Sequence, residues 1–375
     1  MSHNMSVIPS QAFCFYCKRM LPKGSFAKAA CSTCQEEIDR YQSQFTEVEG
    51  IFVRLSDAGL LTTLTEGFRT LTVVSRSGIS HTRSNPRVVI EEGYVVGLNL
   101  RSQSICSVPN NIGEATHLEF LDLSSNCITD LPSEITQLQG LRTFRADQNL
   151  VRQLPEEFGK LSQLEELSLA GNQLQRIPNS FSQLQNLQEL NLSNNKLRSF
   201  PKPITALRLQ KLDLSSNKIR KMTADLSTME NLQFLNLSYN SLWRIETSLP
   251  ANLERLIVMN NRLKEIPPCF FLHPKLTHLN LNFNQIQVTP QTESSEGVLR
   301  VLRLRGNKLH EVSSLANVQT LRHVDLALNF DLGRLEQTFG SVDPRQWNQG
   351  WLKEDIRLFH SLISSTDSSA AISCD

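Results

Sequence analysis

The sequence predicts an α/β solenoid, in which short parallel β-strands line a curved, concave face and short helices or 3-10 turns lie on the convex face. Two observations predict this fold. An asparagine recurs at steps of 21 to 23 residues, and apolar residues hold fixed places around it. Self-similarity at one period is typical of repeat architectures, in which each repeat buries its apolar face only against its neighbours. The asparagines are Asn126, Asn149, Asn172, Asn195, Asn217, Asn240, Asn261, Asn284, Asn307 and Asn329.

The repeated phrase is that of a leucine-rich repeat. A clear copy reads Leu190-x-Leu192-x-x-Asn195-x-Leu197. The first two leucines are two residues apart, so on a short strand they point to the same side, into the core. The asparagine side chain carries two donors and one acceptor, so it can bond the backbone of the turn where neighbouring coils stack. We therefore predict a leucine-rich repeat solenoid over residues 94–330, with about 11 repeats including a degenerate first, held together by an asparagine ladder.

Composition narrows the class of protein. The chain has 375 residues, a net charge of +1 and 20% charged residues, which argues against a strongly basic nucleic-acid binder. It contains no long apolar run and begins without a basic segment followed by an apolar one, so we expect neither membrane insertion nor secretion. Half of its eight cysteines are scattered, which favours a reducing compartment, the cytoplasm or the nucleus.

Residues 1–44 contain two CxxC pairs, Cys14 with Cys17 and Cys31 with Cys34. Two such pairs can place four thiolates tetrahedrally around one Zn²⁺ ion, and four thiolates leave no open position for catalysis. We predict a structural zinc knuckle, with a redox or disulfide role and four unligated thiols as the alternatives. Metal binding would supply most of the folding free energy of so short a segment.

Residues 45–93 are expected to cap the first coil, because a solenoid end otherwise exposes apolar core. Apolar residues from Ile51 to Phe68 favour a helix, and Leu71 begins a strand. The stretch from Arg87 to Val96 reads as a β-hairpin closed by a turn that contains glycine.

The repeats come in two forms. The first five end in an apolar residue and a proline, and another apolar residue stands three positions later, which predicts short helices or 3-10 turns. The prolines are Pro109, Pro132, Pro155, Pro178 and Pro201, and the later apolar residues are Ile112, Ile135, Phe158, Phe181 and Ile204. This form resembles the intracellular Ras-suppressor and plant Ras-group class, whose members are scaffolds and regulators. Most repeats after Asn217 lack the proline, so we expect a less regular convex side there.

The C-terminal residues fall outside the repeat pattern. Apolar spacing from Trp351 to Ile363 predicts a helix, and we assign residues 331–363 to a C-terminal cap. The serine-rich residues 364–375 are predicted to be disordered.

The repeat pattern also indicates which side chains face outward from the strands. In the early repeats these positions are mostly polar, with Phe120 as the exception. Three consecutive later repeats place large apolar side chains there, beside arginines. Exposed apolar clusters mark contact sites, and aromatic residues, methionine and arginine are enriched in interface cores. We predict a partner-binding surface made of Phe234, Tyr239, Arg255, Ile257, Met259, Phe283, Arg303 and Arg305.

The sequence favours binding over catalysis. It contains no phosphate-binding glycine loop, no HExxH and no nucleophile elbow. His278 and His323, with Glu254 and Asp325 in range, could form an acid–base pair, but surface histidines on repeats are usually only polar surface. We predict a non-enzymatic scaffold or adaptor that binds a protein partner on the concave face. The alternatives are a nucleic-acid-associated protein, using the zinc knuckle and an arginine-rich repeat surface, and a substrate adaptor of a ubiquitin ligase.

Overall fold

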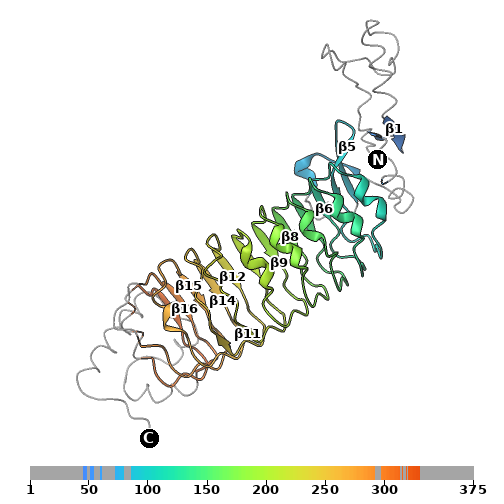
Figure 1. The fold of residues 1–375 in the computed structure, drawn as a ribbon. Coiled ribbons are helices and arrows are strands. Elements are labelled where there is room, and N and C mark those ends of the chain that lie inside the picture. The colour runs from blue at the N-terminus through green and yellow to red at the C-terminus, as the bar shows by residue number, and fades with distance from the viewer. Residues whose placement is uncertain are drawn as a thin grey trace, which may run out of the picture. The chain divides into compact units, whose positions relative to one another are not determined.

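The computed structural model describes residues 45–48, 51–54, 60, 72–79, 86–291, 297–312, 315, 318 and 320–329. The predicted zinc knuckle, C-terminal cap and tail lie outside these residues. The chain consists of two compact units, an N-terminal unit of residues 1–164 and a C-terminal unit of residues 165–375. Figure 1 shows that within each unit the repeats follow one another in chain order, each contributing one short strand. No helix of the described residues is long and apolar enough to cross a membrane.

The described part of the N-terminal unit begins with an antiparallel hairpin of β1 (Phe45–Val48) and β2 (Ile51–Arg54). The helix predicted from Ile51 onward is therefore wrong over β2, because the apolar and β-branched residues there pair with β1 instead. A second hairpin joins β4 (Arg87–Glu91) to β5 (Tyr94–Asn99). Its turn has Glu92 at φ 49° and Gly93 at φ 80°, two positive values that suit the twist of a tight hairpin.

The second hairpin leads directly into the repeats of the N-terminal unit. On one side β4 pairs with the two-residue strand β3 (Thr72–Val73), and on the other β5 pairs in parallel with β6 (Phe120–Asp122). The next strand, β7 (Thr143–Arg145), is parallel to β6. The first repeat thus uses a hairpin arm as its strand.

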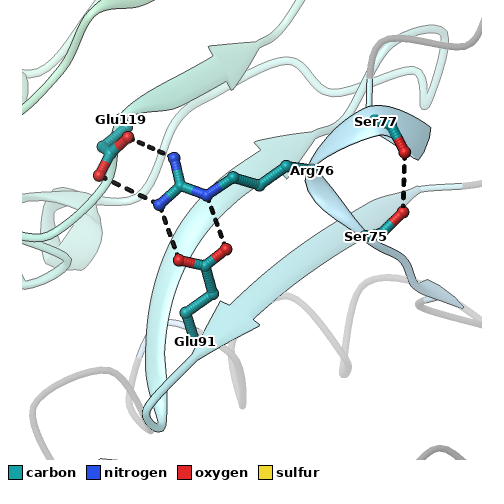
Figure 2. A network of polar contacts seen from close by, with 5 residues as sticks. All are labelled: Ser75, Arg76, Ser77, Glu91 and Glu119. Carbon is teal, nitrogen blue, oxygen red and sulfur yellow. Dashed lines mark hydrogen bonds and ion pairs between the residues drawn. The ribbon is translucent and has the colours of Figure 1, made fainter.

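Apolar packing and one arginine join the hairpin to the first complete repeat. Ile79, Val89 and Val96 form a small core. Phe120 packs against this core and is partly buried, which explains why an apolar residue occupies an outward position of its strand. Arg76, in the 3-10 turn η1 (Arg76–Gly78), binds two carboxylates (Figure 2). Its Nε and Nη2 donate to Glu91 at 2.6 and 2.7 Å, and its Nη1 donates to Glu119 at 2.6 Å.

These ion pairs affect the titration of all three groups. Hydrogen bonds from Arg76 hold the pKa values of Glu91 and Glu119 below their usual range, and hydrogen bonds to the two carboxylates raise the pKa of Arg76. The side chains are about half exposed, so solvent screening keeps the stabilisation small, on the order of 1 kcal/mol.

The C-terminal unit repeats one parallel strand per coil. Each strand pairs with its neighbours in register, and a buried central leucine or valine alternates with two outward residues. The strands are β8 (Glu166–Ser168), β9 (Glu189–Asn191), β10 (Lys211–Asp213), β12 (Phe234–Asn236), β14 (Arg255–Ile257), β15 (His278–Asn280), β16 (Val301–Arg303) and β17 (His323–Asp325).

Short 3-10 turns follow the prolines, as the sequence predicts. The apolar residue three positions after each of the five prolines is fully buried. The turns are η2 (Asn110–Glu114), η3 (Ser133–Gln137), η4 (Phe158–Lys160), η5 (Asn179–Gln183), η6 (Lys202–Ala206) and η7 (Pro268–Phe270). Two of the repeats that lack the proline, those of Asn217 and Asn240, instead contribute β11 (Lys221–Met222) and β13 (Arg244–Ile245), which pair in parallel. The predicted loss of regularity is thus a local change from turn to strand.

Nine of the ten ladder asparagines connect their coil to the preceding coil of the same unit. All ten are buried except Asn240, which is half-buried. In nine of them the amide nitrogen donates to a carbonyl of the preceding coil and to one of its own coil, while the amide oxygen accepts a backbone N–H. Asn172 donates to the carbonyl of Leu169 in its own coil. These bonds satisfy backbone groups that burial would otherwise leave unpaired.

A buried histidine supports the turn after η7. Nδ1 of His273 accepts the N–H of Leu276 at 2.9 Å and of Lys275 at 3.2 Å, and Nε2 lies 2.9 Å from the carbonyl of Pro250. The proton of the neutral ring therefore resides on Nε2. Burial lowers the pKa of His273, although the bond to Pro250 opposes this shift.

We expect stability to fall at mildly acidic pH through His273. Because its folded pKa lies below its unfolded value of about 6.5, its contribution is complete above that pH and is lost as pH falls through the folded pKa. The wild-type melting temperature should therefore decrease from pH 7.5 to 5.5 more than that of His273→Gln. Equal decreases in the two proteins would show that this ring does not set the pH dependence.

Candidate functional site

The outward residues of the strands in the C-terminal unit form its strand face, which carries the predicted partner surface. Each strand places its first and third residues on this face. Phe234 and Arg255 are register neighbours in the first column, and Asn236 and Ile257 are neighbours in the third. Phe234, Ile257 and Met259 are half-buried and Arg255 is exposed. The repeat pattern therefore places these side chains on one face of adjacent coils.

Two further predicted residues lie at the edge of this face, immediately before the ladder asparagine. Tyr239 and Phe283 are 54% and 40% exposed and have φ values of 54° and 55°. Tyr239 donates its N–H to the carbonyl of Met259, which joins the edge to the strand face. The ring of Phe283 lies over Gly306, where an added methyl group would come within 2.5 Å of the ring. A left-handed backbone conformation is unfavourable for bulky residues, so the local backbone gives no reason for an aromatic side chain at either position.

The third column shows why Ile257 differs from its neighbours. Asp213, Asn236 and Asn280 each accept, with a side-chain oxygen, the backbone N–H two residues ahead, at 2.8 to 3.1 Å. Such Asx turns stabilise the bend after the strand. Ile257 and Arg303 occupy the same column and lack a carbonyl side chain, so they cannot serve the turn. Their side chains are available for contacts outside the fold.

Arginines continue the face beyond the apolar residues. Arg255, Arg300, Arg303 and Arg322 are exposed, and Arg305 is half-buried. Among the residues that the structure describes, none of these five guanidinium groups forms an ion pair.

The charges of these arginines act on a histidine of the same face. His278 lies between Arg255 and Val301 in the first column. Its pKa is lowered by burial first, and then by the charges of Arg255, Arg303 and Arg300, against a smaller opposing effect of Glu254. The surface therefore combines apolar contact area with arginines that form no ion pair among the described residues.

The chain matches the family described as leucine-rich repeat region over residues 94–290, just over half of its length. It belongs to the leucine-rich repeat family. The parallel strands and 3-10 turns described above are the structural expression of this membership.

Several known proteins are similar to part of the chain. Human serine/threonine-protein kinase 11-interacting protein is 39% identical over 62 residues, which span 16% of this chain but only 6% of that protein. The functional domain of InlJ from Listeria monocytogenes is 22% identical with a TM-score of 0.50, covering 63% of this chain and 54% of that one. The Arabidopsis thaliana receptor kinase ectodomain GASSHO1/SCHENGEN3, solved with CASPARIAN STRIP INTEGRITY FACTOR 2, is 24% identical with a TM-score of 0.48, covering 68% and 38%. The structural likenesses show the fold alone.

The histidines considered for acid–base chemistry are not paired in this leucine-rich repeat sheet. His278 and His323 are two strands apart, with Val301 between them. Nδ1 of His278 lies 2.8 Å from the Thr277 hydroxyl, and a carboxylate oxygen of Asp325 accepts the N–H of Ala327. Within the described part of the chain, no hydrogen bond joins either histidine to Asp325 or Glu254.

Sequence reasoning missed one member of the edge. Leu328 is exposed and has φ 59°, at the same place before the ladder asparagine as Tyr239 and Phe283. The signal was present, because the same position of the repeat carries all three residues. The four predicted zinc ligands lie outside the described residues, among which no group of three or more histidine, cysteine or acidic side chains could hold a metal ion.

Proposed function

We propose that this leucine-rich repeat protein is a non-enzymatic scaffold or adaptor that binds a protein partner on the strand face of its C-terminal unit. The observation that carries the proposal is the juxtaposition of outward apolar side chains with arginines that form no ion pair among the described residues. Leucine-rich repeat proteins commonly mediate protein–protein interactions. The proline-containing form of the early repeats further supports placing this chain with the Ras-suppressor-like scaffolds.

The chemistry of the face indicates the kind of segment that it would bind. Phe234, Ile257 and Met259 offer apolar contact area along neighbouring strands, and the edge adds Tyr239 and Phe283. Apolar anchors surrounded by polar groups supply most of the binding energy of an interface. The arginines favour acidic side chains near those anchors, since complementary charge raises the association rate and fixes orientation. We therefore infer a partner segment that carries apolar anchors and carboxylates.

Affinity purification with mass spectrometry tests this function directly. The wild-type chain is compared with the double variant Phe234→Ala, Ile257→Ala. A partner that the wild type captures and the variant does not would support the strand face as the binding surface. If the variant still captures the partner, the strand face is not the binding surface.

We also propose that residues 1–44 bind one structural Zn²⁺ through Cys14, Cys17, Cys31 and Cys34, and that the protein acts inside the cell. The spacing of the two CxxC pairs suits a four-thiolate site. A second contact from this module would raise avidity for a partner already held by the repeats.

Metal analysis of the purified protein tests this zinc site. Purified protein should contain about one zinc per chain, since a four-thiolate site holds a single ion. Cys14→Ser with Cys31→Ser should lose it, because one ligand is removed from each pair. Cys106→Ser is the matched control, because Cys106 is an exposed free thiol of the repeats. Zinc retained by the double variant, or absent from the wild type, would contradict the site.

A further inference from the structure

A second charged surface lies on the coil segments that follow the ladder asparagines, apart from the strand face. Over four consecutive repeats, three of these segments carry cations, which form two rows. We call this surface the basic flank, and its residues are Lys196, Arg198, Lys218, Arg220, Arg262 and Lys264. All six side chains are exposed.

The rows form because the repeats stack in register. Lys218 donates its N–H to the carbonyl of Leu197, Trp243 donates to that of Arg220, and Arg262 donates to that of Leu242. Each buried residue between two cations points into the core, so the cations on either side of it point outward together. Neighbouring coils are about 4.8 Å apart, which brings the cations of adjacent repeats close to one another.

These cations are not neutralised within the fold. In the described part of the chain, none of the six forms an ion pair. The nearby Glu246 and Glu265 are both engaged by Arg244, at 3.1 and 3.7 Å. Close like charges repel unless counterions gather on them, so such a surface binds polyanions. A net charge of +1 for the whole chain conceals this local separation of charge.

An aromatic side chain interrupts both rows at the coil of Asn240. Trp243 stands in the row between Arg220 and Lys264, and the small Ser241 takes the corresponding place in the other row. The ammonium group of Lys221 lies 5.0 Å from the ring centroid of Trp243, and the residue is 44% exposed. The Lys221 ammonium covers one face of the ring, and the rest of the ring is partly open to solvent. Cations stand on the coils before and after it, and the small Ser241 lies in the parallel row.

We propose that the basic flank binds single-stranded nucleic acid, with phosphates on the cations and a base stacked on Trp243. Binding of single strands combines a positive surface along the sugar–phosphate backbone with aromatic rings on which bases stack. The replacement of cations by Trp243 and Ser241 at one coil provides a place for a base between two phosphate-binding positions. An anionic membrane or an acidic peptide would need the charge but not the gap.

The experiment measures binding of a fluorescein-labelled oligouridylate of about 15 nucleotides, close to the longest site of a single-strand-binding module, to the full-length chain by fluorescence anisotropy. We expect affinity to fall steeply as salt rises. Arg220→Gln with Lys264→Gln should weaken binding at least about tenfold and lower the salt slope by about 1.4, because two phosphate contacts are lost. Trp243→Ala should weaken binding about tenfold while leaving the slope unchanged, because a stacking contact is lost. Thermal melts confirm that the variants are folded.

The matched control is Arg300→Gln with Arg303→Gln, which removes the same charge from the strand face. It should change affinity by less than about twofold, since only local phosphate contacts count toward the salt slope. The proposal is overturned if the wild type does not bind the oligonucleotide, if the control loses as much affinity as the flank variant, or if Trp243→Ala binds normally. Sedimentation with phosphatidylserine vesicles that depends on Trp243, without oligonucleotide binding, would assign the flank to a membrane instead.

Discussion

Replacement of Asn217 by alanine is expected to lower the free energy of unfolding by about 1–3 kcal/mol, the cost of leaving buried polar groups unpaired. Nδ2 of Asn217 donates to the carbonyls of Leu192 at 2.9 Å and Leu214 at 3.1 Å, and Oδ1 accepts the N–H of Leu197 at 3.0 Å. Alanine makes none of these bonds, and the burial of the residue limits access of water. The loss affects the contact between two coils, on which a repeat protein depends for its cooperativity.

Thermal and chemical denaturation measure this loss, and hydrogen exchange locates it. The amide of Leu197 should exchange faster in the variant, because its acceptor is gone. Asn231→Ala is the control, since Asn231 is exposed and lies outside the ladder, and we expect it to melt as the wild type does. Asn195→Ala should behave like Asn217→Ala, because it makes the same kind of bonds. Indistinguishable melts for all of these proteins would refute the stabilising role of the ladder.

The repeats could be predicted because their determinants are local and periodic. A buried leucine, an asparagine and a proline each recur at a fixed place, so one physical explanation applies to every coil. The 3-10 turns after the prolines and the irregular coils after Asn217 follow from the same reasoning, and the structure confirms both. The Asx turns of the third column are equally periodic, but a polar residue on a strand gives no sign by itself that it bonds its own backbone.

The region before the repeats could not be predicted in the same way because its determinants are not periodic. Arg76 meets Glu91 and Glu119, which are 15 and 43 residues away in the sequence, and nothing in the spacing of three charged residues indicates that they will meet. A short apolar run such as Ile51–Arg54 fits a helix or a strand, and only its partner decides between them. The candidate site shows the same limit, since the pattern places Phe234 outward but does not show that it is half-buried.

The double variant Phe234→Ala, Ile257→Ala is expected to reduce partner capture by at least about a hundredfold, because each buried anchor of an interface contributes about 1.4 kcal/mol or more and each such step is a factor of ten. The two side chains project from adjacent strands, β12 and β14, so a partner that covers one would also reach the other. Both are only half-buried in the free protein, so their truncation removes only a small part of the packing on the sheet. We therefore expect a melting temperature close to that of the wild type, together with a loss of binding much larger than any loss of stability.

A matched control separates binding at the strand face from general stickiness. Leu272 and Val288 are 45% and 40% exposed and belong to the same unit. Neither residue lies on the strands that form the strand face. Leu272→Ala with Val288→Ala removes comparable apolar surface and should leave capture intact. If this control loses the partner as completely as Phe234→Ala with Ile257→Ala, binding depends on exposed apolar area in general. If only the strand-face variant loses it, the two anchors act where the repeat pattern places them, and Arg255→Glu should then weaken the same partner because its carboxylates lose their counter-charge.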